Sequence, residues 1–342
     1  MIRIKLCGGF QNRNPFAYEP FLNHLTSEIA LVDEAEDADL LLISHPMDLE
    51  LSSAEFAMML AQQKRLRLVL LSEEPFWDTG WGRDPFCRDL ISESIHGSFT
   101  CRVISHQTTT VFKTSHLPYF LLTDPRYIAH YRPLFDYNAG MSVAGWLAHF
   151  RSAEIDAAFF SERRLAPRDR ITFAASDVWG LSWYRTRFAE RCRKGHVLRA
   201  GKGWGDDPPR QSLPDWHADK LTRLNRRCRY LGAFENTHQA DYISEKIFDA
   251  FAVGAMPLYF AAENHAVHQL IEPGSWLNFY ATPPRAPAFD ARRPVSLAEA
   301  EAYAAAQIQL AKTMCDLAAT ESDLDRICKA TLKELRAALA SR

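Results

Sequence analysis

The segment Tyr230–Phe260, YLGAFENTHQADYISEKIFDAFAVGAMPLYF, places a dense group of polar side chains between two apolar stretches. Its first residues, Tyr230–Phe234, are apolar and aromatic and predict a short strand, and the polar residues that follow predict a loop. Ser244 is a candidate N-cap of a helix that Gly254 would end, because glycine readily adopts the left-handed conformation that closes helices. Residues 256–260 then predict a second strand. The segment therefore predicts the order strand, polar loop, helix, strand.

Four polar residues fall in the predicted loop and the first helical turn: Asn236, Tyr242, Glu245 and Lys246. In an open parallel sheet, ligands bind in the crevice beyond the carboxyl ends of the strands. The N-terminus of a helix also attracts anions, because its backbone N–H groups lack partners and the helix dipole is positive there. These residues are therefore candidates for binding an anionic ligand.

Strands and helices alternate along much of the chain. Met1–Leu6, Asp39–Ser44 and Arg67–Leu71 are predicted strands, and Ser53–Gln63 is a predicted helix between the second and third of them. A second alternating region follows residue 170, with these predicted elements: strand Ile171–Ala175, helix Ser182–Arg193 and strand His196–Arg199. The pattern is typical of α/β proteins with parallel sheets.

The length of 342 residues favours two domains. The segment Arg163–Arg170 is charged, contains a proline and lacks periodicity, as linkers often do. We therefore expect one domain at 1–165 and a second at 166–342. Two alanine-rich helices are expected at the end of the second, Ser296–Ala319 and Ser322–Ala340. The last is amphipathic and basic, which favours a packed terminal helix and also allows peripheral contact with a membrane surface.

Composition excludes several classes of protein. A formal net charge of −2 and a pI near 6.6 give no basic footprint for nucleic acid. Seven cysteines form no CxxC pair and are odd in number, which argues against a disulfide framework and against a zinc site. No apolar run approaches the length of a membrane-spanning helix, and the first residues do not resemble a signal peptide. We expect a cytoplasmic protein, with the inner membrane surface as a site of peripheral contact.

Three short runs resemble the signature of the α1,3/4-fucosyltransferases, glycosyltransferase family ten. These runs are Phe234-Glu235-Asn236-Thr237, Asp241-Tyr242-Ile243-Ser244-Glu245-Lys246 and Ala255-Met256-Pro257-Leu258-Tyr259. The family has FENS, then YVTEK, then a small residue and P-[IVL]-[YV]. After this last run the family usually has a glycine, whereas this chain has Phe260-Ala261-Ala262.

The resemblance implies the GT-B architecture: two Rossmann-like domains facing a cleft, with C-terminal helices. The N-terminal domain would bind the acceptor and the C-terminal domain the GDP-sugar. Animal members carry a membrane stem, so this chain is similar to bacterial, cytoplasmic members.

The resemblance also implies a donor site. Arg185 matches the arginine of the family's R-x-x-[FL] helix, which binds the donor diphosphate, whereas Arg187 lies off that pattern. A guanidinium fork suits phosphate oxygens, and Lys246 would add a point charge to the same phosphates. Glu245 matches the glutamate that hydrogen-bonds the ribose hydroxyls. Asn236 and Tyr242 match residues that line the donor pocket.

The candidate catalytic base is Glu73, at the end of the strand Arg67–Leu71, where a parallel sheet exposes groups that face a ligand. Glu73-Glu74-Pro75 resembles the family's E-S-P, whose first glutamate is regarded as the base. If the register is off by one, Glu74 takes this role. Two solvated loop carboxylates without a catalytic role remain the alternative.

The resemblance implies an inverting transfer of L-fucose from GDP-fucose to a hydroxyl of a glycan or glycolipid, with the 3-hydroxyl of N-acetylglucosamine or glucose as the family's usual target. A GT-B enzyme with another nucleotide sugar, or a catalytically silent sugar-nucleotide or carbohydrate-binding protein, are the alternatives. No metal is required, and a divalent cation would at most stimulate. Asp37-Ala38-Asp39 is interpreted as a turn, and the spacing of Glu263, His265 and His268 as chance, because no fourth ligand is evident.

Overall fold

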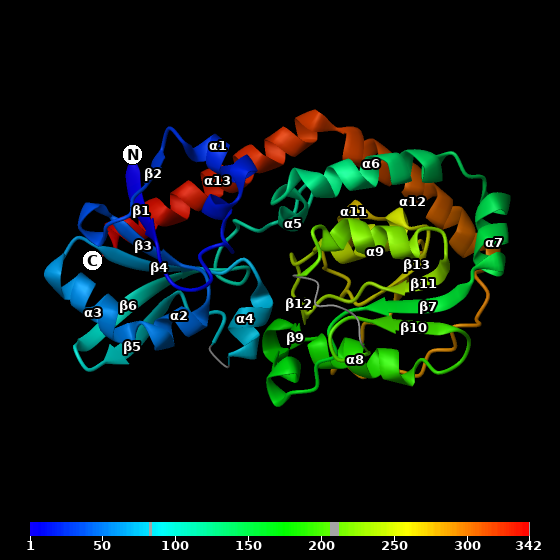
Figure 1. The fold of residues 1–342 in the computed structure, drawn as a ribbon, viewed down its shortest axis with the longest axis horizontal. Helices are drawn as coiled ribbons and strands as arrows, with labels where there is room; N and C mark the ends of the chain where they lie inside the picture. The colour runs from blue at the N-terminus through cyan, green and yellow to red at the C-terminus, as the bar shows by residue number, and fades with distance from the viewer. Residues whose placement is uncertain (82–83, 206–211, 342) are drawn as a thin grey trace. The chain divides into compact units, whose positions relative to one another are not determined.

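The chain folds into two compact units in a computed structural model that describes residues 1–81, 84–205 and 212–341. Unit 1 comprises Met1–Ser115, Leu122–Asp124 and Thr320–Arg342, and unit 2 comprises His116–Leu121 and Pro125–Ala319. Each unit is an α/β structure with its own mainly parallel sheet (Figure 1). The predicted α/β class with two Rossmann-like domains is therefore confirmed. That the two domains face a cleft stays a prediction.

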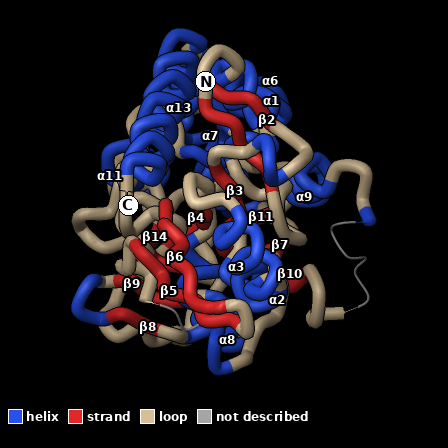
Figure 2. The backbone as a smooth tube through the Cα atoms, turned by 90° about the vertical axis from the view of Figure 1, so that its left-hand side faces the viewer, coloured by secondary structure: helices blue, strands red, loops and turns tan. Residues whose placement is uncertain are grey.

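The sheet of unit 1 has the strand order β2-β1-β3-β4-β6-β5. All neighbours pair in parallel except β5, which is antiparallel to β6 at the edge of the sheet (Figure 2). The strands are β1 (Ile2–Leu6), β2 (Ile29–Leu31), β3 (Leu40–Ile43), β4 (Arg67–Leu71), β5 (Asp89–Ser94) and β6 (Gly97–Ile104). The three strands expected in this region are confirmed within one or two residues. β3 and β4 are short apolar runs that are almost entirely buried, whereas β1 alternates buried Ile2 and Ile4 with the exposed Arg3.

Apolar side chains of the central strands, including Leu41, Leu70 and Val103, pack with Phe56 into the core of unit 1. Phe56 comes from α3 (Ser53–Gln62), the helix expected between β3 and β4. The other helices that begin in this part of the chain are α1 (Glu19–Leu25), α2 (Pro46–Leu51), α4 (Pro75–Gly80), α5 (Tyr119–Leu122) and the short 3-10 turns η1 (Pro15–Ala17) and η2 (Ala35–Asp37).

The sheet of unit 2 is entirely parallel, with the order β10-β7-β11-β13-β14. Its strands are β7 (Ile155–Phe160), β10 (Val197–Ala200), β11 (Cys228–Gly232), β13 (Met256–Tyr259) and β14 (Leu277–Asn278). Since β10 and β11 lie on opposite sides of β7, the strand order reverses between β7 and β11. Ligands of open parallel sheets bind at such a reversal, and the polar loop after β11 begins there.

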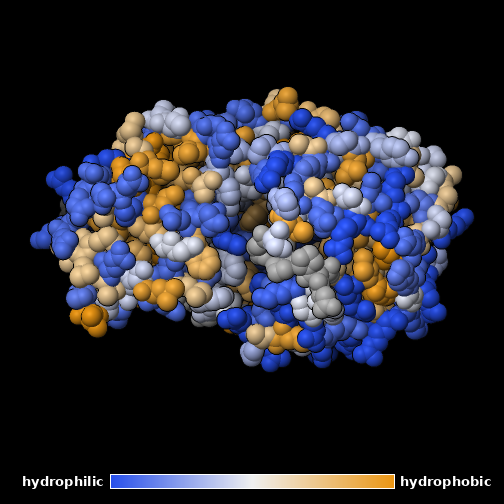
Figure 3. Space-filling view, in the orientation of Figure 1, coloured by the Kyte–Doolittle hydropathy of each residue, from blue (hydrophilic) through white to orange (hydrophobic). Residues whose placement is uncertain are grey.

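Helices cover both faces of this sheet: α6, α9 and α12 lie on one side and α8 on the other, under a mainly hydrophilic surface (Figures 1 and 3). The helices are α6 (Pro125–Ala139), α7 (Val143–Ser152), α8 (Ser182–Arg191), α9 (Trp216–Leu224), α10 (Glu245–Ala252), α11 (Val267–Leu270), α12 (Leu297–Cys315) and the 3-10 turns η3 (Pro167–Arg170) and η4 (Ala174–Ser176). A small antiparallel sheet combines β12 (Thr237–His238), β9 (Val178–Gly180) and β8 (Thr172–Phe173). No helix in the described part of the chain is long and apolar enough to cross a membrane.

The division between the units differs from the boundary expected at 165/166. β7 pairs with both β10 and β11, so it is an inner strand of the second sheet, and α6 and α7 before it also belong to unit 2. Arg163–Arg170 therefore lies inside unit 2 and is no linker. The expected strand Ile171–Ala175 is also corrected, because only Thr172–Phe173 is extended and it pairs in the small sheet. Sequence periodicity indicates strands, but it does not indicate which sheet a strand joins.

The last helix, α13 (Leu317–Ala340), lies in unit 1 from residue 320 onward, beside α1 (Figure 1). Ile327 and Leu335 are fully buried. Arg336 forms an ion pair with Glu28, the residue before β2. The interpretation as a packed terminal helix is confirmed. Peripheral contact with a membrane through this helix stays a prediction.

A buried ion-pair network fixes α10 against its neighbours in unit 2. The fully buried carboxylate of Asp249 accepts hydrogen bonds from Lys220 Nζ (2.6 Å), His217 Nε2 (2.7 Å) and Tyr131 Oη (2.6 Å). Burial alone would raise the pKa of Asp249, but the charges of Lys220 and His217 outweigh it and lower the pKa. One carboxylate thus joins α10 to α6 and α9.

We predict that Asp249→Ala lowers the free energy of unfolding by about 3 to 5 kcal/mol, because it leaves Lys220 buried without its counter-charge. Urea denaturation measures this loss. The control is Asp219→Ala on α9, whose pair with Arg223 is long and more than a third exposed; it should change stability by at most about 1 kcal/mol. Equal small losses in both variants would contradict the role assigned to Asp249.

Candidate active site

The polar loop after β11 is tied to the helices on either side of it. The carbonyl oxygen of Asn236 accepts a hydrogen bond from the backbone N–H of Leu181 at 2.7 Å, immediately before α8 begins. At the other end of the loop, Ser244 precedes the first residue of α10, as predicted. Gly254 has a φ of +77° just beyond the end of α10, the left-handed conformation expected of it. The loop therefore connects the N-termini of α8 and α10.

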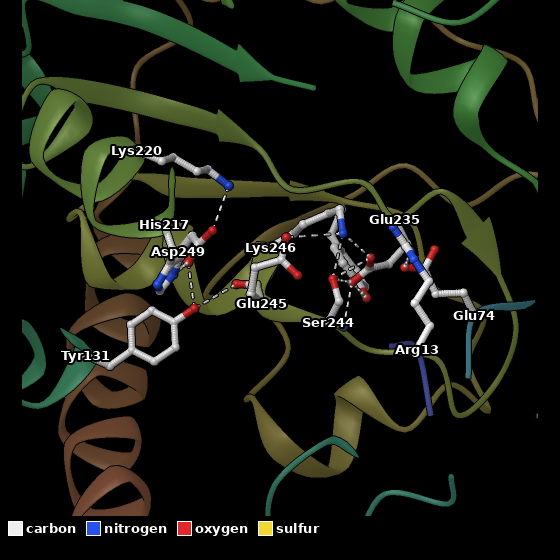
Figure 4. A network of polar contacts seen from close by, with 11 residues as sticks. Arg13, Glu74, Tyr131, His217, Lys220, Glu235, Ser244, Glu245, Lys246 and Asp249 are labelled. Carbon is white, nitrogen blue, oxygen red and sulfur yellow. Dashed lines mark hydrogen bonds and ion pairs between the residues drawn. The ribbon is translucent and has the colours of Figure 1, made fainter. Parts of the chain in front are cut away.

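Glu235 is the central acceptor of this loop, with only 3 % of its surface exposed. Its carboxylate accepts hydrogen bonds from the Ser244 backbone N–H (2.8 Å) and hydroxyl (2.8 Å) and lies 3.0 Å from Lys246 Nζ (Figure 4). The sequence alone gives no role for Glu235, although its position between Phe234 and Asn236 in the motif is a signal. Glu235 holds the start of α10 against the end of β11.

Lys246 and Glu245 form a compensated charge cluster with Glu235 at the start of α10. Lys246 Nζ lies 3.4 Å from Glu245 Oε1 in addition to its contact with Glu235. Burial alone would lower the pKa of Lys246, but the two carboxylates raise it. Burial alone would raise the pKa of Glu245, but the Lys246 charge lowers it. Lys246 and Glu245 therefore stay charged at neutral pH, and Lys246 is held in place by two carboxylates.

Arg185 is a buried cation without a hydrogen-bond partner among the described residues. Its side chain lies on α8 with 8 % of its surface exposed, and its buried Nε bonds to no acceptor. Burial and the nearby Arg164 charge together lower the pKa of Arg185 to about 10, although the charge of Glu235 partly compensates. A buried guanidinium is costly unless it is paired. An unpaired one beside a helix N-terminus therefore indicates a site for an anionic ligand.

The structure places Asn236 and Tyr242 in the same loop with different exposures. Asn236 is half-buried, whereas Tyr242 is almost fully buried and its ring meets Phe120 edge-on at 5.4 Å between centroids. The charge of Arg185 interacts with Tyr242 and Glu245 as well as with Glu235. The five predicted donor residues thus lie in two adjoining places, the β11–α10 connection and the first turn of α8.

In unit 1, Glu73 lies two residues after β4 and is 3 % exposed. Tyr18 Oη donates a hydrogen bond to Glu73 Oε1 at 2.7 Å, and His106 Nε2 contacts the Glu73 carbonyl oxygen at 2.7 Å. Burial raises the pKa of Tyr18, and the Glu73 charge raises it further, so the phenol keeps its proton. Burial lowers the pKa of His106 to about 3, so the neutral ring donates to the carbonyl. Two donors from distant parts of the chain fix Glu73.

Glu74 has different surroundings. Its carboxylate is 19 % exposed and pairs with Arg13, whose Nη1 lies 3.2 Å from Oε1. The Arg13 guanidinium lies in turn over the Trp77 ring, 5.4 Å from its centroid. The nearby buried carboxyl of Asp78 has its pKa raised to about 8 by burial and is protonated at neutral pH. Of the two glutamates, Glu73 is the buried one, and the neutral donor Tyr18 orients its carboxylate.

Two sequence motifs that resemble metal sites, and to which we assign no metal, have structural explanations. Asp37 ends the 3-10 turn η2, and Asp39 follows it and pairs with Arg3 at 2.8 Å, so the Asp37-Ala38-Asp39 run is a turn as interpreted. His265 is buried, and His268 Nε2 contacts the Ala262 carbonyl oxygen at 3.0 Å. Within residues 1–81, 84–205 and 212–341, no group of three or more His, Cys, Asp or Glu side chains is placed to hold a metal ion.

Comparison with known proteins finds a family match within unit 2. Residues 182–282, under a third of the chain, match the family described as glycosyltransferase family 10 (fucosyltransferase), C-terminal part. This segment runs from the start of α8 through β14 and contains every predicted donor residue. No curated protein matches the chain.

Solved structures show weaker likeness. One is described as α1,3-fucosyltransferase with GDP-fucose, at 12 % identity and a TM-score of 0.42, covering 99 % of this chain and 90 % of that one. Another is Anabaena HepE in complex with UDP-glucose, at 12 % identity and a TM-score of 0.38, covering 98 % and 100 %.

Residues 182–282 are thus similar to the C-terminal part of glycosyltransferase family 10, the fucosyltransferase family. The resemblance seen in the sequence is confirmed over this segment.

Arg185 gives a prediction that separates function from stability. We predict that Arg185→Leu raises the free energy of unfolding of the ligand-free protein by about 1 to 3 kcal/mol, because it removes an unsatisfied buried charge. The same variant should lose the increase in melting temperature that an anionic nucleotide confers on the native protein. Thermal and urea denaturation with and without GDP measure both effects. Arg151→Leu, an exposed arginine of α7, is the control, and a clear destabilisation by Arg185→Leu would contradict the ligand site.

Proposed function

We propose that the protein is an inverting fucosyltransferase that moves L-fucose from GDP-fucose to a hydroxyl of an N-acetylglucosamine or glucose unit in a glycan or glycolipid. The observation that carries this proposal is the buried, unpaired guanidinium of Arg185 beside the charged start of α10, inside the segment that matches the family. A diphosphate would supply the counter-charge that this guanidinium lacks. The planar fork of arginine donates two parallel hydrogen bonds that suit phosphate oxygens.

Each predicted donor residue then has a physical role. Arg185 stabilises the charge that builds on the departing diphosphate. Glu245, charged at the first position of α10, accepts hydrogen bonds from the ribose hydroxyls. Lys246 is held by Glu235 and Glu245, so it contributes a fixed positive charge beside the phosphates at little entropic cost. Asn236 and Tyr242 line the nucleotide-binding side of the loop. Since these groups are present, we propose no required metal; a divalent cation would at most stimulate.

The catalytic base is Glu73 of unit 1. Its carboxylate takes the proton of the acceptor hydroxyl, and the acceptor oxygen forms a bond to the anomeric carbon of fucose. The bond between that carbon and the β-phosphate oxygen breaks on the opposite face, and GDP leaves with the electron pair. The configuration at the anomeric carbon is therefore inverted. Tyr18 and His106 hold the carboxylate and its backbone in place, which favours a productive geometry.

The direct test is GDP release from GDP-fucose, with and without a panel of N-acetyllactosamine and glucose-containing glycans. Release that requires an acceptor, with a fucosylated product of inverted configuration by NMR, supports the proposal. Binding of GDP-fucose without turnover on any acceptor would favour a sugar-nucleotide-binding protein instead. No binding of GDP-fucose at all would contradict the proposal.

We predict that Glu73→Gln lowers kcat by about 10²- to 10⁴-fold, the contribution of a general base, while Glu74→Gln lowers it less than about tenfold. Glutamine keeps the shape and the hydrogen bond from Tyr18 but does not take a proton. Both variants should retain the melting-temperature increase with GDP-fucose, which shows that the donor site is intact. The reverse order of the two effects would transfer the catalytic role to Glu74.

We predict that Tyr18→Phe moves the acidic limb of the kcat/KM profile to higher pH by about one unit or more. The phenol donates to the carboxylate form of Glu73 and so favours that form over the acid; a hydrogen bond to a charged group is worth about 1.5 to 3 kcal/mol. Without it, the base loses its proton only at higher pH. Activity at high pH should recover toward the native value, whereas a uniform loss at every pH would indicate damaged packing.

A further inference from the structure

Positive charge is concentrated in one part of a nearly neutral chain. Residues 162–199 contain ten lysines or arginines and four aspartates or glutamates, a formal net charge of +6, whereas the whole chain carries −2. Arg185, one of the ten, is buried on the side of α8 that serves the candidate donor site. The exposed side of the same helix carries Trp183 and Arg187, one turn apart. The charge excess is therefore larger than the donor site requires.

A pocket of about 520 Å³ lies on this exposed side of α8. Trp183, Arg187, Glu190 and Arg191 of α8 line it, together with Arg193 and Arg285. The volume is within the range of small-ligand sites. Four arginines and a tryptophan therefore surround one hollow. Like charges that lie this close repel one another, so such a lining favours an anionic ligand.

Glu190, the acidic residue in the lining of this pocket, does not neutralise the charge of its four arginines. Glu190 already pairs with Arg163 (2.7 Å) and with Arg187 (2.7 Å). Arg193 and Arg285 contact no carboxylate among the described residues: the first donates to a carbonyl, and the second makes no polar contact there. Two guanidinium groups thus face a shared hollow without counter-charges.

Trp183 supplies the remaining wall of the pocket. Its ring is half-buried, and the guanidinium groups of Arg187 and Arg170 lie 5.4 Å and 5.8 Å from its centroid. These cation–π contacts hold the Arg187 side chain beside the hollow. A flat aromatic surface bordered by fixed guanidinium groups binds a ligand that combines an anionic group with a less polar part.

We propose that this pocket binds a phosphate-bearing ligand at a site separate from the donor site. Arginine forks bind phosphate oxygens in a bidentate manner, and the Trp183 ring would contact the organic part attached to the phosphate. Two sources share this chemistry, the head group of an acidic phospholipid and a soluble phosphate ester or pyrophosphate. The proposal does not depend on which sugar the enzyme transfers.

The test compares the double variant Arg193→Gln/Arg285→Gln with the control Arg151→Gln/Lys312→Gln, which removes the same charge from exposed side chains elsewhere in unit 2. Both are made in the Arg185→Leu background, so that the donor site does not contribute. The first arm measures co-sedimentation with phosphatidylcholine vesicles with and without phosphatidylglycerol. The second measures the melting temperature with inorganic pyrophosphate.

We expect the background protein to bind at least one of the two probes, and the pocket variant to bind it about thirtyfold more weakly, equivalent to about 2 kcal/mol. The control should bind like the background protein. A loss confined to vesicles with phosphatidylglycerol assigns the pocket to lipid head groups, and a loss confined to pyrophosphate assigns it to soluble phosphates. Binding of neither probe, or equal losses in the pocket variant and the control, overturns the proposal.

Discussion

The buried carboxylate of Glu235 is the contact on which the candidate site depends. It lies just beyond β11, at the point where the strand order of the second sheet reverses. It accepts hydrogen bonds from the backbone N–H and the hydroxyl of Ser244. Because the same carboxylate pairs with Lys246, one interaction fixes the loop, the N-terminus of α10 and a positive charge. Asp249, at the other end of the first turn of α10, anchors the helix to α6 and α9. The geometry of the site is therefore set by two buried carboxylates.

Arg185 shows the opposite arrangement, a buried charge that the protein leaves unpaired. Stability alone would select against it, because desolvating a guanidinium without a partner costs free energy. The neighbouring carboxylates are already engaged, Glu235 with Ser244 and Lys246. We therefore propose that this cation serves a ligand, which agrees with the similarity of residues 182–282 to the family 10 glycosyltransferases.

Local motifs could be read from the sequence, and long-range partners could not. The segment Tyr230–Phe260 predicts its own strand, loop, helix and strand, because caps, apolar periodicity and glycine act over a few residues. The division between units was not predictable in this way, since the place of β7 depends on pairing with β11, some seventy residues later. The same holds for Tyr18 and His106, whose hydrogen bonds to Glu73 bridge 55 and 33 residues. Glu235 was within the motif, but burial decides its role, and burial is a property of the fold.

We propose that unit 2 binds a GDP-sugar through Arg185. Isothermal titration of the protein with GDP-fucose and with UDP-glucose tests it most directly, with the Arg185→Leu variant titrated in parallel. We expect GDP-fucose to bind more tightly than UDP-glucose, and we expect the variant to lose most of this affinity. Tighter binding of UDP-glucose, or undiminished binding of GDP-fucose by the variant, would contradict it.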